Sequence, residues 1–211
     1  MKMWRMSVLV GTGTMAAMAL TGCSLSSLIP EAKPDPTRFF VLSNSTAGAP
    51  SPSAANAPTV QLRLEVAGYA RTRPMLVRRG DNELEFREFA RWGEPIEQGI
   101  ARVLREELLA RGAREVVVAG SRAGREAGGM SHDLTVRVLA CEGEAGGGVN
   151  FRAVWELSLG GDKTETSNAA TLRGDFRASG LRWEGKDEAT LAAALSQAVS
   201  RLAGEIAAAF R

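Results

Sequence analysis

Residues 60–66 read VQLRLEV, and this stretch carries the clearest secondary-structure signal in the chain. Its apolar residues alternate with polar ones, which is the two-residue period of a β-strand with one buried and one solvated face. The same reasoning predicts strands at 75–79 and 83–89. The triplet Gly80-Asp81-Asn82 between them is rich in turn formers, so these two strands are expected to pair as a hairpin.

Two amphipathic helices are expected to cover one face of this sheet. The first opens at Trp92-Gly93-Glu94-Pro95, because proline suits a first helical position and Glu94 the positive end of the helix dipole. Gly112 is expected just after its end. The second begins at an N-cap, Asp187, and continues to the C-terminus. Their apolar stripes are Ile96, Ile100, Val103, Leu104 and Leu108, and Leu191, Leu195, Ala198, Val199, Leu202, Ile206 and Phe210.

The remaining strands complete a predicted order of β, β, hairpin, α, β, β, β, β, α. They are expected at 38–43, 115–119, 134–138, 149–159 and, with a weaker pattern, within 162–176. Residues 44–58 and 121–129 are expected to be loops. The economical packing places the two helices on one face of a mostly antiparallel mixed sheet, so the predicted fold class is α+β.

The N-terminus has the pattern of a bacterial lipoprotein signal. A short positive segment precedes an apolar stretch, residues 8–20, which small residues interrupt and which is short for a membrane span. It ends in Leu20-Thr21-Gly22-Cys23, an aliphatic residue and two small residues before a cysteine. We expect residues 1–22 to be cleaved and Cys23 to be lipidated with acyl chains such as palmitate. The alternative is an ordinary cleaved signal peptide with a chance cysteine.

The rest of the chain is expected to be a tether and one domain. Residues 23–37 are polar and proline-bearing, which predicts a lipidated tether, and 38–211 are predicted to be a single domain. Ser24, rather than an aspartate, follows the cysteine, which favours the periplasmic face of the outer membrane. The formal net charge of +2 is lost when Lys2 and Arg5 are removed with the signal peptide, which makes the mature chain formally neutral. Charge therefore gives no reason to expect a nucleic-acid partner.

The sequence offers no constellation that predicts catalysis or metal binding. His132 is the only histidine, and a loop or strand-edge position explains it. Cys141 has no partner within the chain once Cys23 is acylated, so we interpret it as a small core residue at a strand end. Metal-ligand spacing and a phosphate loop are both missing. We therefore predict no metal, no cofactor and no enzymatic activity, while paired carboxylates on the hairpin keep a catalytic alternative open.

The hairpin is the candidate partner-binding surface. Its arginines either form a solvated face paired with acidic residues across the hairpin or dock a partner, since guanidinium groups make bidentate contacts with carboxylates and lipid phosphates. Trp92 is either a core anchor or an interface anchor. The candidate binding residues are Arg73, Arg78, Arg79, Asp81, Asn82 and Trp92.

The block from Tyr69 to Leu104 resembles the ABC-type transport auxiliary lipoprotein family, and is most similar to its paraquat-inducible protein C type. The resemblance is carried by Tyr69, Arg73-Pro74-Met75-Leu76-Val77-Arg78-Arg79, Asn82-Glu83-Leu84, Arg91-Trp92-Gly93-Glu94-Pro95-Ile96 and Ile100-Ala101-Arg102-Val103-Leu104. Gly93 and Ile96 stand where alanine and leucine are commoner in the family.

The resemblance implies a non-catalytic outer-membrane lipoprotein of a mammalian-cell-entry (MCE) transport system. MCE-domain proteins form hexameric rings or tubes across the periplasm and move phospholipids or other apolar molecules between membranes. The lipoprotein would dock such a tube at the outer membrane, held in the outer-membrane lipid by its acyl anchor, and copies of it could form a homo-oligomeric ring. The alternative is an envelope-assembly lipoprotein that binds peptidoglycan enzymes or β-barrel proteins.

Overall fold

The structure is a computed structural model that describes residues 33–44, 57–119, 131–160 and 170–209. The expected signal peptide, Cys23, most of the tether and the centres of the expected loops lie outside the described residues. Residues Pro36–Arg211 form one compact unit.

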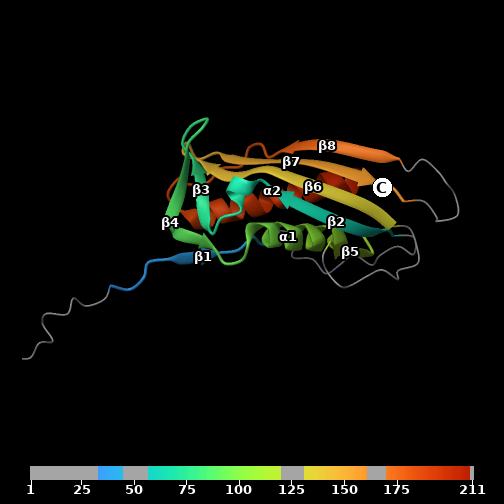
Figure 1. Cartoon of the computed structure of the whole chain (residues 1–211), viewed down its shortest axis with the longest axis horizontal. Helices are drawn as coiled ribbons and strands as arrows, with labels where there is room; N and C mark the ends of the chain where they lie inside the picture. The colour runs from blue at the N-terminus through green and yellow to red at the C-terminus, as the bar shows by residue number, and fades with distance from the viewer. Residues whose placement is uncertain (1–32, 45–56, 120–130, 161–169, 210–211) are drawn as a thin grey trace, which may run out of the picture. The chain divides into compact units, whose positions relative to one another are not determined.

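The order of elements predicted from the sequence is confirmed (Figure 1). The strands are β1 (Arg38–Phe40), β2 (Thr59–Val66), β3 (Pro74–Arg78), β4 (Leu84–Trp92), β5 (Glu115–Val118), β6 (Ser131–Glu144), β7 (Val149–Ser158) and β8 (Thr171–Arg177). The helices are α1 (Ile96–Ala110) and α2 (Glu188–Ala209), and a short 3-10 turn, η2 (Gly68–Ala70), follows β2.

The strands form one mixed sheet that branches at β6. Along one edge of β6, β2 runs parallel to residues 131–138, and β3 runs parallel to Gly143 and Glu144. The other edge pairs with β7, and this antiparallel ladder is the longest in the sheet. The register shifts between Val138 and Ala140, just where β6 changes its neighbour from β2 to β3. The predicted α+β class with a mixed sheet is confirmed.

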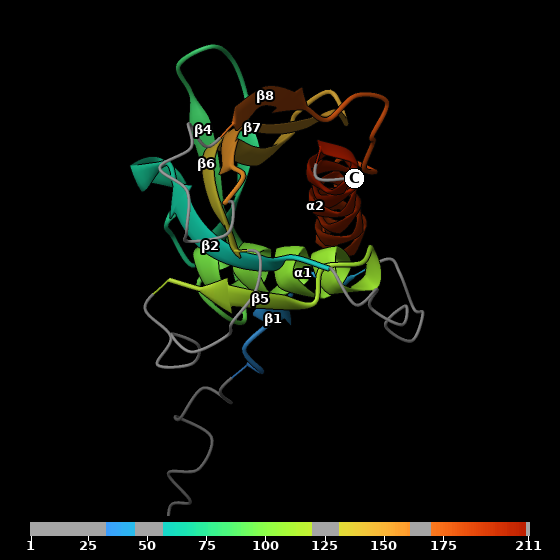
Figure 2. The same cartoon turned by 90° about the vertical axis from the view of Figure 1, so that its right-hand side faces the viewer.

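Both helices contribute their predicted apolar stripes to one core, apart from Phe210, which lies outside the described residues. Figure 2 shows the sheet curving over α2, with α1 beside it. Leu104 of α1 and Leu195 of α2 are buried together with Val136 and Phe151 of the sheet in one hydrophobic cluster. Apolar residues of the sheet that point away from solvent therefore have helices to pack against, which is the physical reason for the two-layer arrangement.

The boundaries differ from the sequence-based expectation at several places. The largest difference is in β6, which was expected at 134–138 and runs from Ser131 to Glu144, because its ladder with β7 continues past the alternating residues. The first strand ends at Phe40 rather than at residue 43, because Leu42 turns into the core and is 1% exposed. Helix α1 begins at Ile96, and Pro95 is its N-cap with an extended ψ of 130°. The other two expected helix ends are confirmed: Asp187 Oδ1 accepts a hydrogen bond from Ala189 N, and Gly112 follows α1 with a φ of +108°.

Candidate functional site

The tip of the β3–β4 hairpin is exposed and carries mixed charge. Arg79, Asp81 and Asn82 are all exposed there, and Figure 1 shows the hairpin extending beyond the neighbouring strands. The Arg79 backbone N–H donates to the Glu83 carbonyl oxygen at 3.0 Å, which closes the turn. The Arg79 guanidinium pairs across the hairpin with the Glu85 carboxylate. This pair agrees with the first interpretation of the arginines, a solvated face paired with acidic residues across the hairpin.

Arg78, the preceding residue, lies in a different environment. Its Nε and Nη2 atoms both lie 2.8 Å from Glu142 Oε1, and the Glu142 side chain is 0% exposed. Its Nη1 donates to the Asp81 carbonyl oxygen at 2.9 Å. Arg78 therefore ties the end of β3, at the base of the turn, to β6 and supports the turn from below.

The Glu142 carboxylate is the centre of a buried polar cluster. Besides Arg78, it accepts hydrogen bonds from Tyr69 Oη at 2.9 Å, Asn150 Nδ2 at 2.8 Å and the Cys141 backbone N–H at 2.9 Å. A buried carboxylate without partners would be strongly destabilising, so this number of donors explains how the charge is accommodated. We call Tyr69, Arg78, Glu142 and Asn150 the Glu142 cluster.

The Glu142 cluster occupies the branch point of the sheet. Between Val138 and Gly143, β6 has neither β2 nor β3 registered along that edge. The Glu142 side chain takes up the Cys141 N–H in this gap, and the Tyr69 hydroxyl also lies 3.2 Å from the Leu139 carbonyl oxygen. The cluster thus replaces the missing backbone ladder and joins η2, β3, β6 and β7.

Tyr69, Arg78 and Cys141 are held in their protonated forms at neutral pH. Burial and the nearby Glu142 charge raise the pKa of the Tyr69 hydroxyl to about 12. Burial likewise raises the pKa of the Cys141 thiol to about 12. The hydrogen bond with Glu142 raises the pKa of Arg78. The Tyr69 and Cys141 protons are therefore held well above neutral pH, which suits a structural role for the cluster rather than proton transfer.

Trp92 and Glu94 support the start of α1. The Trp92 side chain is 5% exposed and belongs to the core, which favours the first of its two interpretations, a core anchor. Glu94 Oε1 accepts a hydrogen bond from Arg102 Nη2 at 2.7 Å, and the same nitrogen donates to the Leu42 carbonyl oxygen at 2.7 Å. Arg73 is exposed beside this region, and its carbonyl oxygen accepts the Trp92 N–H at 2.7 Å.

His132 and Cys141 are both inside the protein. His132 is 4% exposed, not at an edge, because β6 begins at Ser131 and lies between β2 and β7. Its Nδ1 accepts a hydrogen bond from Gly160 N at 3.2 Å, and burial lowers its pKa. Cys141 is a core residue, as the sequence predicted, but it lies within β6 rather than at the end of the strand.

Within the described residues, no three side chains of the His, Cys, Asp or Glu type are grouped as metal ligands. In the same part of the chain, no helix is long and apolar enough to cross a membrane.

Sequence reasoning missed two buried carboxylates. Glu142 follows the apolar run of β6. Its position on a core strand was the only feature of the sequence that could have indicated its burial. Glu107 lies on α1 and is also 0% exposed; it pairs with Arg111 and accepts a hydrogen bond from Ser200 Oγ of α2 at 2.7 Å. Ser200 is 93 positions from Glu107 in the sequence, so the helix pattern alone could not reveal that Glu107 is buried against α2.

Comparison with known proteins places the chain in a family. The sequence pattern described as ABC-type transport auxiliary lipoprotein component matches residues 40–207. No functionally curated protein matches the chain. A solved structure of an uncharacterised protein is similar with a TM-score of 0.64 at 16% identity, covering 83% of this chain and 99% of the other. A Xanthomonas campestris protein assigned to DUF330 gives 0.55 at 15% identity, covering 81% and 93%. At these identities the two structures support the fold.

Proposed function

Because the chain belongs to the ABC-type transport auxiliary lipoprotein family, we propose that it is a non-catalytic outer-membrane lipoprotein that docks a periplasmic MCE-domain protein during intermembrane lipid transport. The family match over residues 40–207 carries this proposal, since it spans nearly all of the elements from β2 to α2. The resemblance seen in the hairpin and the start of α1 is thereby confirmed at the level of the family.

The proposal includes the anchor. Residues 1–22 act as the signal peptide, Cys23 carries the acyl chains, residues 23–37 are the tether, and residues 38–211 are one domain. The motif Leu20-Thr21-Gly22-Cys23 supports this assignment. Acyl chains hold such a protein durably only when more than one is attached, because each buried methylene contributes about 0.8 kcal/mol.

The docking surface of the proposal is the exposed part of the hairpin. Arg79, Asp81 and Asn82 at the tip are available to a partner, and so is Arg73 at the opposite end of β3, whereas Arg78 is engaged with the buried Glu142. A rigid base below an exposed, mixed-charge tip supports docking, because a preorganised surface loses little conformational entropy on binding. Arginines at the rim of such an interface favour orientation through contacts with partner carboxylates.

A pull-down of the tagged full-length lipoprotein from gently solubilised envelopes tests the proposal. We expect mass spectrometry to find an MCE-domain protein with the wild type, and much less of it with the Arg73→Glu/Arg79→Glu variant. The matched control is Arg137→Glu/Arg173→Glu, since these arginine side chains are 61% and 73% exposed on strands outside the hairpin. Urea unfolding of each variant establishes that it is folded.

Two results would contradict the proposal. Equal capture by the wild type and the hairpin variant would show that Arg73 and Arg79 do not contribute to docking. Recovery of only β-barrel assembly or peptidoglycan proteins would favour the envelope-assembly function instead. Mass photometry of the captured complex would also show whether the lipoprotein forms the homo-oligomeric ring that the family resemblance implies.

A further inference from the structure

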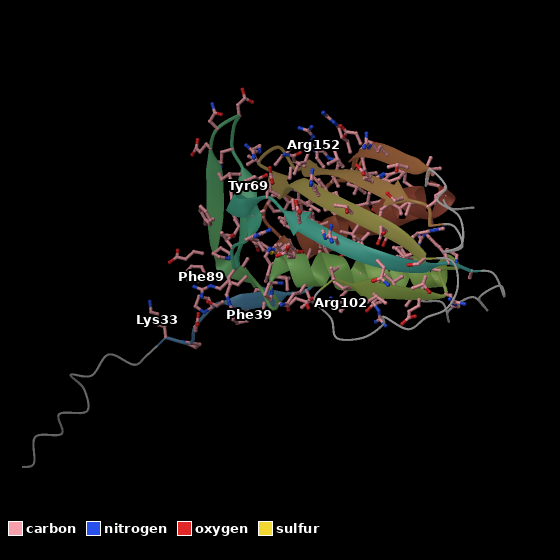
Figure 3. The ribbon with its side chains drawn as sticks, turned by 45° about the vertical axis from the view of Figure 1, so that its right-hand side comes forward. Lys33, Phe39, Tyr69, Phe89, Arg102 and Arg152 are labelled. Carbon is pink, nitrogen blue, oxygen red and sulfur yellow. The ribbon has the colours of Figure 1, made fainter. Side chains whose placement is uncertain are left out.

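A second surface with unusual composition lies where the tether enters the domain. Phe39, Val41, Phe86 and Phe89 are 61%, 54%, 53% and 48% exposed. We call these four residues the aromatic patch. Figure 3 shows Phe39 and Phe89 at the same end of the compact unit. Scattered exposed apolar residues are normal, but three exposed phenylalanines on two adjacent strands, with Val41 just after β1, need an explanation.

The register of β1 and β4 puts Phe39 and Phe89 on one face, whereas Phe86 lies three positions before Phe89, in the irregular part of the β3–β4 ladder. Phe39 pairs in parallel with Arg91, and Phe40 pairs with Trp92. Along β4, Phe89 and Arg91 are exposed while Ala90 and Trp92 are buried. Phe39, Phe89 and Arg91 therefore share the solvent side of the sheet, as strand alternation requires. Phe86 and Phe89 also border a depression of about 340 Å³ that Pro36 and Arg38 help to line.

We propose that the aromatic patch contacts the interfacial zone of the phospholipid bilayer in which the chain is anchored. Aromatic side chains are enriched at this depth of a membrane, where rings meet headgroups and the first methylenes. Phe39 lies sixteen positions after Cys23, so an extended tether can separate them by no more than about 55 Å. An anchor at Cys23 would therefore limit the separation of the patch from the membrane to the length of this tether, which favours a lipid occupant over a protein one.

The charges around the patch favour a zwitterionic surface over an anionic one. Arg91 is exposed and can donate to a lipid phosphate. Glu88 is also exposed, and the depression has Glu85 and Glu188 opposite the two arginines Arg38 and Arg87. These carboxylates balance the arginines, so the contact depends on ring burial and should be insensitive to salt.

The proposal rests on the proposed function only for the anchor at Cys23, and its test removes that dependence. The chain that begins at Cys23 is coupled through this thiol to a maleimide-bearing lipid in phosphatidylcholine vesicles. Cys141 stays unmodified because it is buried and its pKa is raised to about 12. Vesicles whose lipids carry bromine near the headgroup then quench any tryptophan at the interface, and unbrominated vesicles give the reference emission.

The Phe89→Trp variant is compared with Arg173→Trp, which adds the same fluorophore to β8. The native tryptophans Trp92, Trp155 and Trp183 are buried, and the emission of the unsubstituted chain is subtracted as background. We expect quenching at position 89 to exceed that at position 173 by at least about two-fold, at low and at high salt. The Phe39→Trp variant is a second probe of the same surface, which keeps the test decisive if one substitution disturbs the fold.

Equal quenching at the patch and at position 173 would overturn the proposal, and so would self-association through the patch without quenching. No MCE-domain protein is present in this experiment. A negative result here therefore leaves the docking proposal intact, and failure to capture an MCE-domain protein leaves the membrane contact intact.

Discussion

Arg78 and Arg79 are adjacent in the sequence and chemically identical, yet the fold places them in opposite environments. Arg78 pairs with Glu142, whose side chain is 0% exposed, at 2.8 Å. Arg79 pairs with Glu85, and its own side chain is 50% exposed. Because alternate residues of a strand point to opposite sides, one position decides whether an arginine supports the sheet or faces solvent.

The difference separates structural from functional hypotheses within one motif. The Glu142 cluster joins four elements and has few contacts to offer a partner, whereas the tip around Arg79 is exposed and braced from below. Residues that resemble a family need not share one role, since some maintain the scaffold and others are presented by it.

The largest expected effect is on stability at Arg78, at the base of the turn. Arg78→Ala leaves the Glu142 charge buried without its cation, so the free energy of unfolding should fall by about 3–5 kcal/mol. Urea unfolding followed by circular dichroism measures this loss. A loss below about 1 kcal/mol would mean that the buried carboxylate is neutralised or solvated in some other way.

A smaller loss is expected at the contact between the helices. Ser200→Ala removes the 2.7 Å hydrogen bond to Glu107, a second buried carboxylate, while Arg111 stays in place. We expect a decrease of about 1–3 kcal/mol in the free energy of unfolding, because one acceptor loses a donor but the charge remains paired. Ser43→Ala, whose backbone rather than side chain is bonded to α2, is the control and should change stability much less.

The Glu142 cluster should also respond to alkaline pH through Tyr69. The folded state raises the pKa of the Tyr69 hydroxyl from 10.0 to about 12, so it favours the neutral phenol. This contribution is fully present below pH 10 and is lost as the pH rises towards 12. Tyr69→Phe should cost about 1 kcal/mol at neutral pH, and the difference from wild type should shrink above pH 10. Because burial also raises the pKa of Cys141, which both proteins retain, only their difference is interpreted. A constant difference across this range would contradict the assignment.

The smallest expected effect on stability is at the tip. Arg79→Ala breaks an exposed ion pair and should change the free energy of unfolding by less than about 1 kcal/mol. The same urea titration used for Arg78→Ala measures it. If Arg78→Ala and Arg79→Ala lowered the free energy of unfolding equally, the assignment of a structural role to Arg78 and an exposed role to Arg79 would be wrong.

Patterns of short range predicted most of the fold. The alternation in residues 60–66 and the stripe from Ile96 to Leu108 depend on local periodicity, and both are confirmed. The branch at β6 was not predictable, because it depends on which strands become neighbours of Ser131–Glu144. The Glu142 cluster was missed for the same reason: Tyr69 and Glu142 are 73 positions apart, and no local pattern connects them.

In-cell photocrosslinking at the hairpin tip tests the docking hypothesis most directly. A benzophenone amino acid is placed at Asn82, which is exposed, and in a control chain at Arg173 on β8. We predict that irradiation links the chain substituted at Asn82 to an MCE-domain protein, and that the control gives little or none of this product. Crosslinks to an MCE-domain protein at Arg173 but not at Asn82 would place the interface elsewhere and contradict the proposed role of the hairpin.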